Sequence, residues 1–253
     1  NGDFILENVK GDISFKNVFF AYNNEQWVLK GINFEIEAGK VLALVGETGA
    51  GKTSVINVLN RFYDIQKGSI NIDTHSIKDV KLNSLRAQIA FVQQEVFLFS
   101  DSIFNNITLY DEHISINKVE QAAKQIGIHD FISTLPGGYN YSVGERGVTL
   151  STGQRQLIAF LRVYVRNPKI LILDEATSSI DTETEQLLQN ALEKLAINRT
   201  LIIIAHRLST IRNADKILLF QDGKIIEQGT HNYLMQKKGV YQRMYSTQQF
   251  INK

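Results

Sequence analysis

The fold of this chain is decided by residues 41–62, which read VLALVGETGAGKTSVINVLNRF. The five apolar residues Val41 to Val45 are typical of a strand buried on both faces of a sheet. A glycine-rich turn follows, and apolar residues then recur at helical spacing from Ser54 to Phe62. Glycine lets consecutive backbone N–H groups turn inward, and the positive end of the following helix adds to the attraction for an anion. Strand, turn and helix in this order predict a phosphate-binding loop in an α/β fold.

The loop from Gly46 to Thr53 has the glycine, lysine and hydroxyl residues that grip a nucleoside triphosphate. Lys52 is expected to bridge the β and γ phosphates, and the Thr53 hydroxyl is expected to coordinate Mg²⁺. A chance glycine-rich turn is the alternative, but the flanking strand and helix argue against it. We therefore expect ATP and Mg²⁺ as ligands. The predicted ATP-binding residues of this segment are Gly46, Glu47, Thr48, Gly49, Ala50, Gly51, Lys52, Thr53 and Ser54.

A second apolar run, Ile170 to Leu173, ends in the acids Asp174 and Glu175. Open α/β sheets bind their ligands beyond the carboxyl ends of such strands. Asp174 is expected to hold the magnesium, directly or through water, and Glu175 to polarise the attacking water. An acidic pair after a strand is by itself more often a loop cap than a site. The functional interpretation therefore depends on the phosphate loop.

Helical and strand patterns alternate along the chain, which favours a three-layer α/β fold. An amphipathic helix is predicted from Glu183 to Leu195. The stretch from about Asn83 to Arg166 is mostly helical, with glycine-rich breaks at 136–139 and 144–147, and is predicted to be an inserted subdomain. We thus expect a single domain, with an ATP-binding core of about 1–82 and 167–253. Further predicted strands are Ile13 to Tyr22, Ile89 to Val92, Leu201 to Ala205 and Lys216 to Phe220.

Composition excludes several classes of protein. The 253 residues include no cysteine, which rules out disulfides and thiol catalysis, and the five histidines lack zinc-ligand spacing. Lysine and arginine number 27 against 26 acidic residues, so the overall charge of the chain does not attract nucleic acid. The longest apolar runs have five residues, whereas a membrane-spanning helix needs about 20. The N-terminus lacks the pattern of a secretory signal, and its start without methionine suggests a fragment or a processed chain.

The segment Leu150-Ser151-Thr152-Gly153-Gln154 lies shortly before the acidic strand and looks like a family signature. With the phosphate loop and the acids in this order, the chain resembles the nucleotide-binding domain of ATP-binding cassette (ABC) proteins, from roughly Gly11 to Tyr245. The resemblance implies a three-layer P-loop NTPase core with a mainly parallel sheet, an N-terminal antiparallel β subdomain and an inserted α-helical subdomain. It also implies that two such domains pack head to tail, with ATP between one phosphate loop and the partner's signature, residues 150–154.

Two signature residues bear on this shared site. A hydroxyl and free N–H groups at a helix start make an anion site, so Ser151 would contact the partner's ATP. Ser151 could instead be only a helix N-cap, although both roles can coexist. Thr152 departs from the family's usual glycine. Because a β-branched residue disfavours positive φ, either the position does not require that conformation or its contact with ATP is altered.

Four other positions take their roles from the resemblance. Tyr22 is similar to the aromatic residue that stacks on adenine, although a core tyrosine at a strand end is the alternative. Gln94 resembles the glutamine that reaches magnesium and the attacking water, with Gln93 as the alternative. Ser178-Ser-Ile-Asp181 resembles the loop that crosses to the opposite site. His206 resembles the switch histidine that contacts the γ phosphate.

The segment 143–147, Val-Gly-Glu-Arg-Gly, resembles the one that contacts the coupling helices of transmembrane domains in exporters. Gly229-Thr-His231 and Gly239-Val-Tyr241 are also exporter-like. The resemblance thus implies an ATPase domain at the cytoplasmic face of a membrane. Its implied partners are a second nucleotide-binding domain, in a homodimer or heterodimer, and transmembrane domains of the same polypeptide.

No nucleic acid is expected as a partner. Two other functions remain open: a soluble ABC ATPase acting on nucleic acid or ribosomes, and a regulatory nucleotide-binding module with low turnover. The transported substrate does not follow from the sequence, because selectivity would reside in membrane segments.

Overall fold

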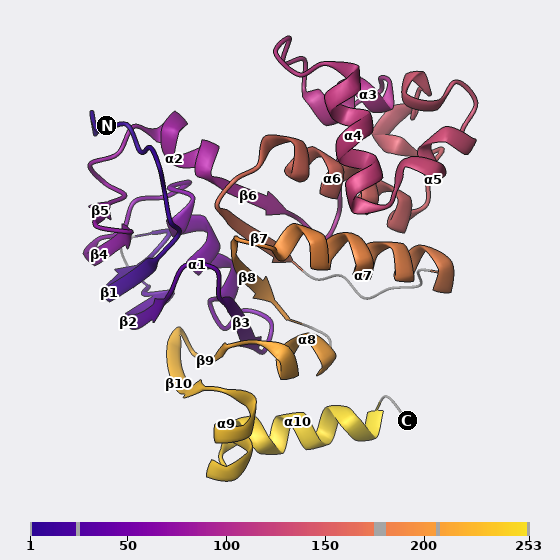
Figure 1. Ribbon diagram of the computed structural model, residues 1–253. Coiled ribbons are helices and arrows are strands. Elements are labelled where there is room, and N and C mark those ends of the chain that lie inside the picture. The colour runs from indigo at the N-terminus through magenta and orange to yellow at the C-terminus, as the bar shows by residue number, and fades with distance from the viewer. Residues whose placement is uncertain (1, 24–25, 175–180, 206–207, 252–253) are drawn as a thin grey trace. The chain divides into compact units, whose positions relative to one another are not determined.

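The computed structural model describes residues 2–23, 26–174, 181–205 and 208–251. The chain forms two compact units (Figure 1). The first, which we call the core unit, comprises residues 1–91, 169–175 and 198–253. The second, which we call the helical unit, comprises residues 92–168 and 176–197. The domain boundaries expected from the sequence stay a prediction.

A six-stranded sheet runs through the core unit in the order β10-β9-β3-β8-β7-β6. Strand β3 pairs in parallel with β8 and with β9, β7 pairs in parallel with β8, and β10 pairs with β9 in the antiparallel sense. Because β3, β7 and β8 are almost wholly apolar, they are buried as strands of a covered parallel sheet should be. The mainly parallel sheet is therefore confirmed. Its strands are β3 (Val41–Gly46), β6 (Ile89–Val92), β7 (Ile170–Asp174), β8 (Thr200–Ile204), β9 (Lys216–Gln221) and β10 (Lys224–Gly229).

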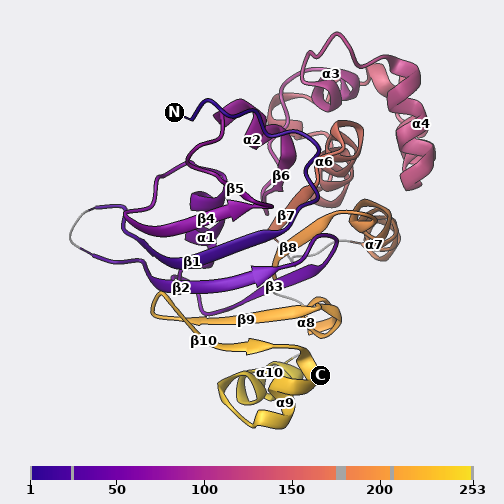
Figure 2. The same cartoon turned by 60° about the vertical axis from the view of Figure 1, so that its left-hand side comes forward.

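A four-stranded sheet near the N-terminus has the order β2-β1-β4-β5, with β1 between β2 and β4 (Figure 2). All its pairings are antiparallel, which confirms the expected antiparallel β subdomain. Alternate residues face inward, and Phe15 of β1 stacks on Phe34 of β2 with ring centroids 4.4 Å apart. The strands are β1 (Ile13–Phe20), β2 (Leu29–Ile36), β4 (Lys67–Ile72) and β5 (His75–Ser76).

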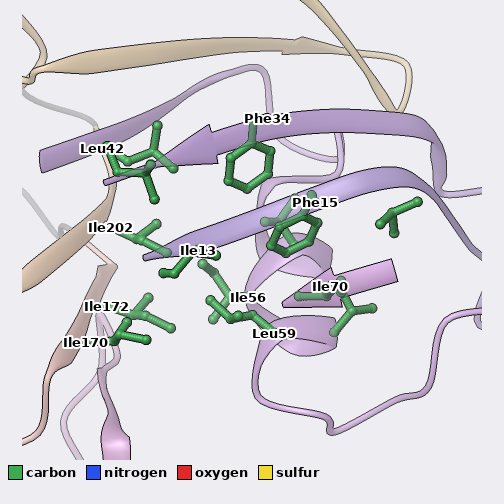
Figure 3. Packing of buried hydrophobic residues seen from close by; sticks show 14 of the residues in the cluster. Ile13, Phe15, Phe34, Leu42, Ile56, Leu59, Ile70, Ile170, Ile172 and Ile202 are labelled. Carbon is green, nitrogen blue, oxygen red and sulfur yellow. The ribbon is translucent and has the colours of Figure 1, made fainter. Parts of the chain in front are cut away.

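The main hydrophobic core forms where both sheets pack on helix α1 (Lys52–Leu59) (Figure 3). Ile56 and Leu59 of α1 are completely buried among side chains such as Ile13 and Ile70 of the antiparallel sheet and Ile202 of β8. Full burial of one such side chain contributes about 1.5–3 kcal/mol. This packing fixes the start of α1, and with it the loop that precedes the helix.

Helix α1 ends earlier than the apolar spacing up to Phe62 predicts. The Asn60 side chain donates a hydrogen bond to the Ile56 carbonyl at 2.9 Å, and Arg61 adopts a left-handed φ of 48°. Both features terminate the helix at Leu59. The remaining helices of the core unit are α2 (Leu82–Gln88), α8 (Leu208–Asn213), α9 (His231–Lys237) and α10 (Val240–Ile251).

Helices α3, α4, α6 and α7 of the helical unit begin with polar caps. The side chains of Ser102, Ser115, Ser151 and Asp181 each accept a hydrogen bond from the backbone three residues later, which satisfies a free N–H at the helix start. The helix expected from Glu183 begins at Thr182 because Asp181 caps it. The helices are α3 (Ile103–Thr108), α4 (Ile116–Ile126), α5 (His129–Thr134), α6 (Thr152–Arg166) and α7 (Thr182–Ala196), with 3₁₀ turns at Gly138–Asn140 and Glu145–Gly147.

Among the residues described above, no helix combines the length and apolar character that crossing a bilayer requires.

Candidate nucleotide-binding site

The phosphate loop connects β3 to α1, and glycine is required at both of its ends. Gly46 has φ 145°, and a Cβ there would collide with the carbonyl oxygen of Phe220 on β9. Gly51 precedes α1 with φ 109°, a conformation that other residues rarely adopt. No side chain caps the first turn of α1 among the described residues, so its N–H groups remain available to an anion.

Lys52 places its ammonium within the loop. The residue is only 7% exposed, and its Nζ donates hydrogen bonds to the carbonyls of Gly46 at 2.6 Å and Glu47 at 2.9 Å. Burial lowers the pKa of Lys52 below its ordinary value, and the negative charge of Asp174 opposes this shift. The loop therefore holds the buried positive charge of Lys52 against its own backbone. A bound phosphate group would need such a charge beside it.

Asp174 and Thr53 supply oxygen ligands of the kind that Mg²⁺ prefers. Asp174 is the last residue of β7, at the carboxyl edge of the sheet, and its negative charge opposes the lowering of the Lys52 pKa. Thr53 is the second residue of α1, and its side chain is exposed. No cluster of three or more His, Cys, Asp or Glu side chains occurs in the described ranges. One carboxylate and one hydroxyl still fit magnesium, because this ion usually takes its other ligands from water and phosphate oxygens.

Tyr22 follows the end of β1 and is 45% exposed, so it is not the core tyrosine of the alternative interpretation. Its hydroxyl lies 3.1 Å from Ser54 Oγ and accepts a hydrogen bond from Asn57 Nδ2 at 2.9 Å. Its ring makes edge contacts with Phe20 and Tyr63, with centroid distances of 4.8 and 4.9 Å. An exposed aromatic ring thus stands beside the helix that begins at Lys52. Sequence patterns gave no sign of Asn57 or Tyr63 at this place.

The signature segment begins helix α6 in the helical unit. Ser151 Oγ accepts from the Gln154 backbone N–H at 3.2 Å, and Gln154 Oε1 accepts from the Ser151 N–H at 3.0 Å. This reciprocal capping box confirms Ser151 as an N-cap. The Ser151 hydroxyl proton is not used in that box, so the anion role stays a prediction.

Thr152 is the first helical residue of α6 and has no positive φ. Position 152 therefore does not require a left-handed conformation in this chain, and an altered contact with ATP stays a prediction. Its Oγ1 accepts a hydrogen bond from Arg155 at 3.1 Å, and Arg155 also donates to the Leu150 carbonyl at 2.7 Å. Gly153, the next signature residue, is buried.

Gln94 lies in the helical unit and, like Gln93, is exposed. It lines a cavity of 740 Å³ together with Glu145, Arg146, Thr152 and Arg155. The exporter-like segment 143–147 and the start of α6 thus share one depression with Gln94. Its proposed reach to magnesium stays a prediction, as does the alternative at Gln93.

Three predicted site residues, Glu175, Ser178 and His206, lie outside the described residues. Asp181, the last residue of the predicted crossing loop, caps α7, and its Oδ1 accepts from the Thr184 N–H at 2.8 Å. The hydrogen bonds from Thr184 lower the pKa of the Asp181 carboxyl. Asp181 thus has a structural role, and its part in the crossing loop stays a prediction.

Residues 29–178, more than half of the chain, match the family described as ABC transporter. The chain belongs to the ABC transporter family and has the α/β fold of its ATPase domain. Membership implies that the chain binds nucleotide. The resemblance drawn from the phosphate loop and the signature is thereby confirmed.

Two similar proteins have names that refer to multidrug export and to lipid flipping. A protein of Staphylococcus aureus, provisionally named a multidrug export ATP-binding/permease protein, is 49% identical over 244 residues, which are 96% of this chain and 42% of that protein. An ATP-dependent lipid A-core flippase of Saccharophagus degradans is 48% identical over 248 residues, 98% of this chain and 42% of the flippase.

Among solved structures, a bacterial Atm1-family ABC exporter with ATP bound matches with a TM-score of 0.87 and 42% identity. The match covers 96% of this chain and 44% of the exporter. The chain therefore spans less than half the length of each of these relatives.

Proposed function

We propose that this chain is the ATPase domain of an ABC exporter, which binds ATP with Mg²⁺ and hydrolyses it to drive export across a membrane. The observation that carries the proposal is the buried Lys52 ammonium, held by the carbonyls of Gly46 and Glu47 in a loop whose helix start is uncapped. Asp174 contributes a carboxylate at the same edge of the sheet. Triphosphate binding needs this combination of a cation, free N–H groups and a metal ligand.

In this proposal each residue has a distinct part in the reaction. The loop 46–54 and Lys52 bind the phosphates, Tyr22 stacks on the adenine, and Thr53, Asp174 and Gln94 hold Mg²⁺, which would neutralise charge on the phosphates. Glu175 orients the attacking water, because water is a weak nucleophile that needs a positioned acceptor. His206 contacts the γ phosphate.

The ATP site would be completed by a second nucleotide-binding domain, whose signature 150–154 would close over the nucleotide head to tail, with Ser178 and Asp181 in the loop that crosses between sites. Ser151, the N-cap of α6, would offer its hydroxyl to a phosphate. The domain would lie at the cytoplasmic face of the membrane and couple to transmembrane domains through the cavity lined by Gln94, Glu145 and Arg146. The export names of the relatives favour this function over a nucleic-acid or purely regulatory one.

Replacing Lys52 by alanine tests the proposal. Lys52→Ala should weaken ATP binding roughly tenfold to a hundredfold, because a hydrogen bond to a charged group contributes about 1.5–3 kcal/mol. Calorimetric titration with MgATP measures the change. Lys16→Ala is the matched control, since Lys16 is an exposed lysine of β1 in the same unit, and it should bind ATP like the original chain. Equal affinity in the Lys52 and Lys16 variants would refute the proposed phosphate loop.

A further inference from the structure

We propose that Asn57 is a positioning residue for the nucleobase, which acts by holding the Tyr22 ring, together with Ser54, in the orientation that stacks on adenine. This inference rests on the proposed function, because it takes Tyr22 as the base platform. It assigns a role to a residue of α1 that contacts neither the phosphates nor the metal in the proposed mechanism.

The Tyr22 hydroxyl is held from α1 by two groups one turn apart. Asn57 Nδ2 donates to the phenol oxygen at 2.9 Å, and Ser54 Oγ lies 3.1 Å from it. A phenol has one proton to donate. Its oxygen accepts from Asn57, and in the hydrogen bond with Ser54 Oγ either hydroxyl can be the donor, so the phenol group has two partners on α1. Two fixed partners on a rigid helix determine where the tip of the ring lies.

The body of the ring is held independently by aromatic contacts. Phe20 and Tyr63 meet it at interplanar angles of 79° and 88°. Phe20 is completely buried, so its contact with Tyr22 is fixed by the packing of the core. Tyr22 nevertheless remains 45% exposed. The ring is therefore held at its tip and its edges while part of it is open to a ligand.

Such a ring is preorganised for stacking. A side chain that must be immobilised on binding costs about 0.5–1.5 kcal/mol, and one already held in place does not. Asn57 is the informative residue to change, because Ser54 is itself a predicted phosphate contact. Loss of the Asn57 side chain should weaken binding of the base without affecting binding of the phosphates.

The test compares MgATP with magnesium and inorganic tripolyphosphate, which has the phosphates and no base. In calorimetric titrations Asn57→Leu should raise the Kd for ATP roughly twofold to tenfold, the equivalent of one neutral hydrogen bond, and leave the Kd for tripolyphosphate unchanged. Tyr22→Phe should have a similar effect. The double variant should be no weaker than the weaker single variant, because both changes remove the same hydrogen bond.

The matched control is Asn117→Leu, which makes the same change at an exposed position of α4 and should alter neither Kd. An unchanged Kd for ATP in Asn57→Leu would overturn the inference. Equal weakening of ATP and tripolyphosphate would also overturn it, since that result indicates a merely structural role in α1. Failure of the proposed function gives a different result, in which Lys52→Ala leaves ATP binding unchanged.

Discussion

At residue 152 a threonine occupies the first helical position of α6, directly after the N-cap Ser151. The family's usual glycine offers conformational freedom, and nothing in the backbone here needs it, because φ at this position is not positive. Thr152 also gains a hydrogen bond from Arg155 that glycine could not accept. The residue is thus accommodated by the helix without strain.

Thr152→Gly is expected to destabilise the helical unit. Replacing threonine by glycine in a helix costs only about 0.3 kcal/mol, because threonine is itself a weak helix former, and loss of the hydrogen bond from Arg155 adds about 0.5–1.5 kcal/mol. Urea denaturation measures the loss. Thr182→Gly makes the same change at the first position of α7 and should show only the smaller, conformational cost. A Thr152→Gly variant as stable as the original chain would contradict this explanation of the threonine.

The residues of the candidate site differ in how far their sequence context predicts them. Lys52, Thr53 and Asp174 could be predicted because each has a fixed place relative to a strand end or a helix start, and such places are visible as local patterns. Asn57 could not be predicted, since its partner Tyr22 lies 35 residues away and meets it only when β1 packs near α1.

At the scale of elements, the C-terminal helix α10 depends on a buried acid from β10. Glu227 is 8% exposed, and its two carboxylate oxygens accept from the backbone N–H groups of Val240 and Tyr241, each at 3.0 Å. A Cβ at Gly239 would collide with Glu227 Oε1, so a larger residue there would displace the carboxylate from its two donors. The negative charge at the positive end of the helix adds to the two hydrogen bonds. The exporter-like Gly239-Val-Tyr241 segment thus has a structural explanation as a capped helix start.

Glu227→Gln should loosen α10. An amide can accept through only one oxygen and presents an N–H₂ group to a backbone donor, so we expect a loss of about 1–2 kcal/mol. Hydrogen exchange of the Val240 and Tyr241 amides should accelerate correspondingly. Glu37→Gln, at an exposed acid in the same unit, should leave exchange at α10 unchanged. Unaltered protection in Glu227→Gln would show that the carboxylate does not stabilise the helix.

Strands could be predicted from the sequence where a run of apolar residues dominated the segment. The apolar runs of β3, β7 and β8 located those strands to within one or two residues, because full burial leaves little room for polar positions. Strand β4, Lys67-Gly-Ser-Ile-Asn-Ile, has only two apolar residues, and pairing with β1 rather than its own composition makes it a strand. The end of α1 depends on the Asn60 side chain and the conformation of Arg61. The spacing of apolar residues reveals neither, so the end of this helix could not be predicted.

At the scale of the whole molecule, the two halves of the proposed ATP site lie in different compact units. The core unit contains the phosphate loop, Tyr22 and Asp174, and the helical unit contains the signature and Gln94. In the proposed dimer the phosphate loop and the signature of one chain would contribute to different composite sites. In the proposed function, hydrolysis would therefore require a partner chain.

The most direct test of the central claim is ATP turnover by Glu175→Gln beside that of the original chain. A neutral amide cannot accept the proton of the attacking water, so turnover should fall by roughly a hundredfold or more while MgATP still binds. If the proposed dimer forms, the ATP-bound variant should accumulate in it, because the hydrolysis that would separate the partners is blocked. Unchanged turnover in Glu175→Gln would contradict the account.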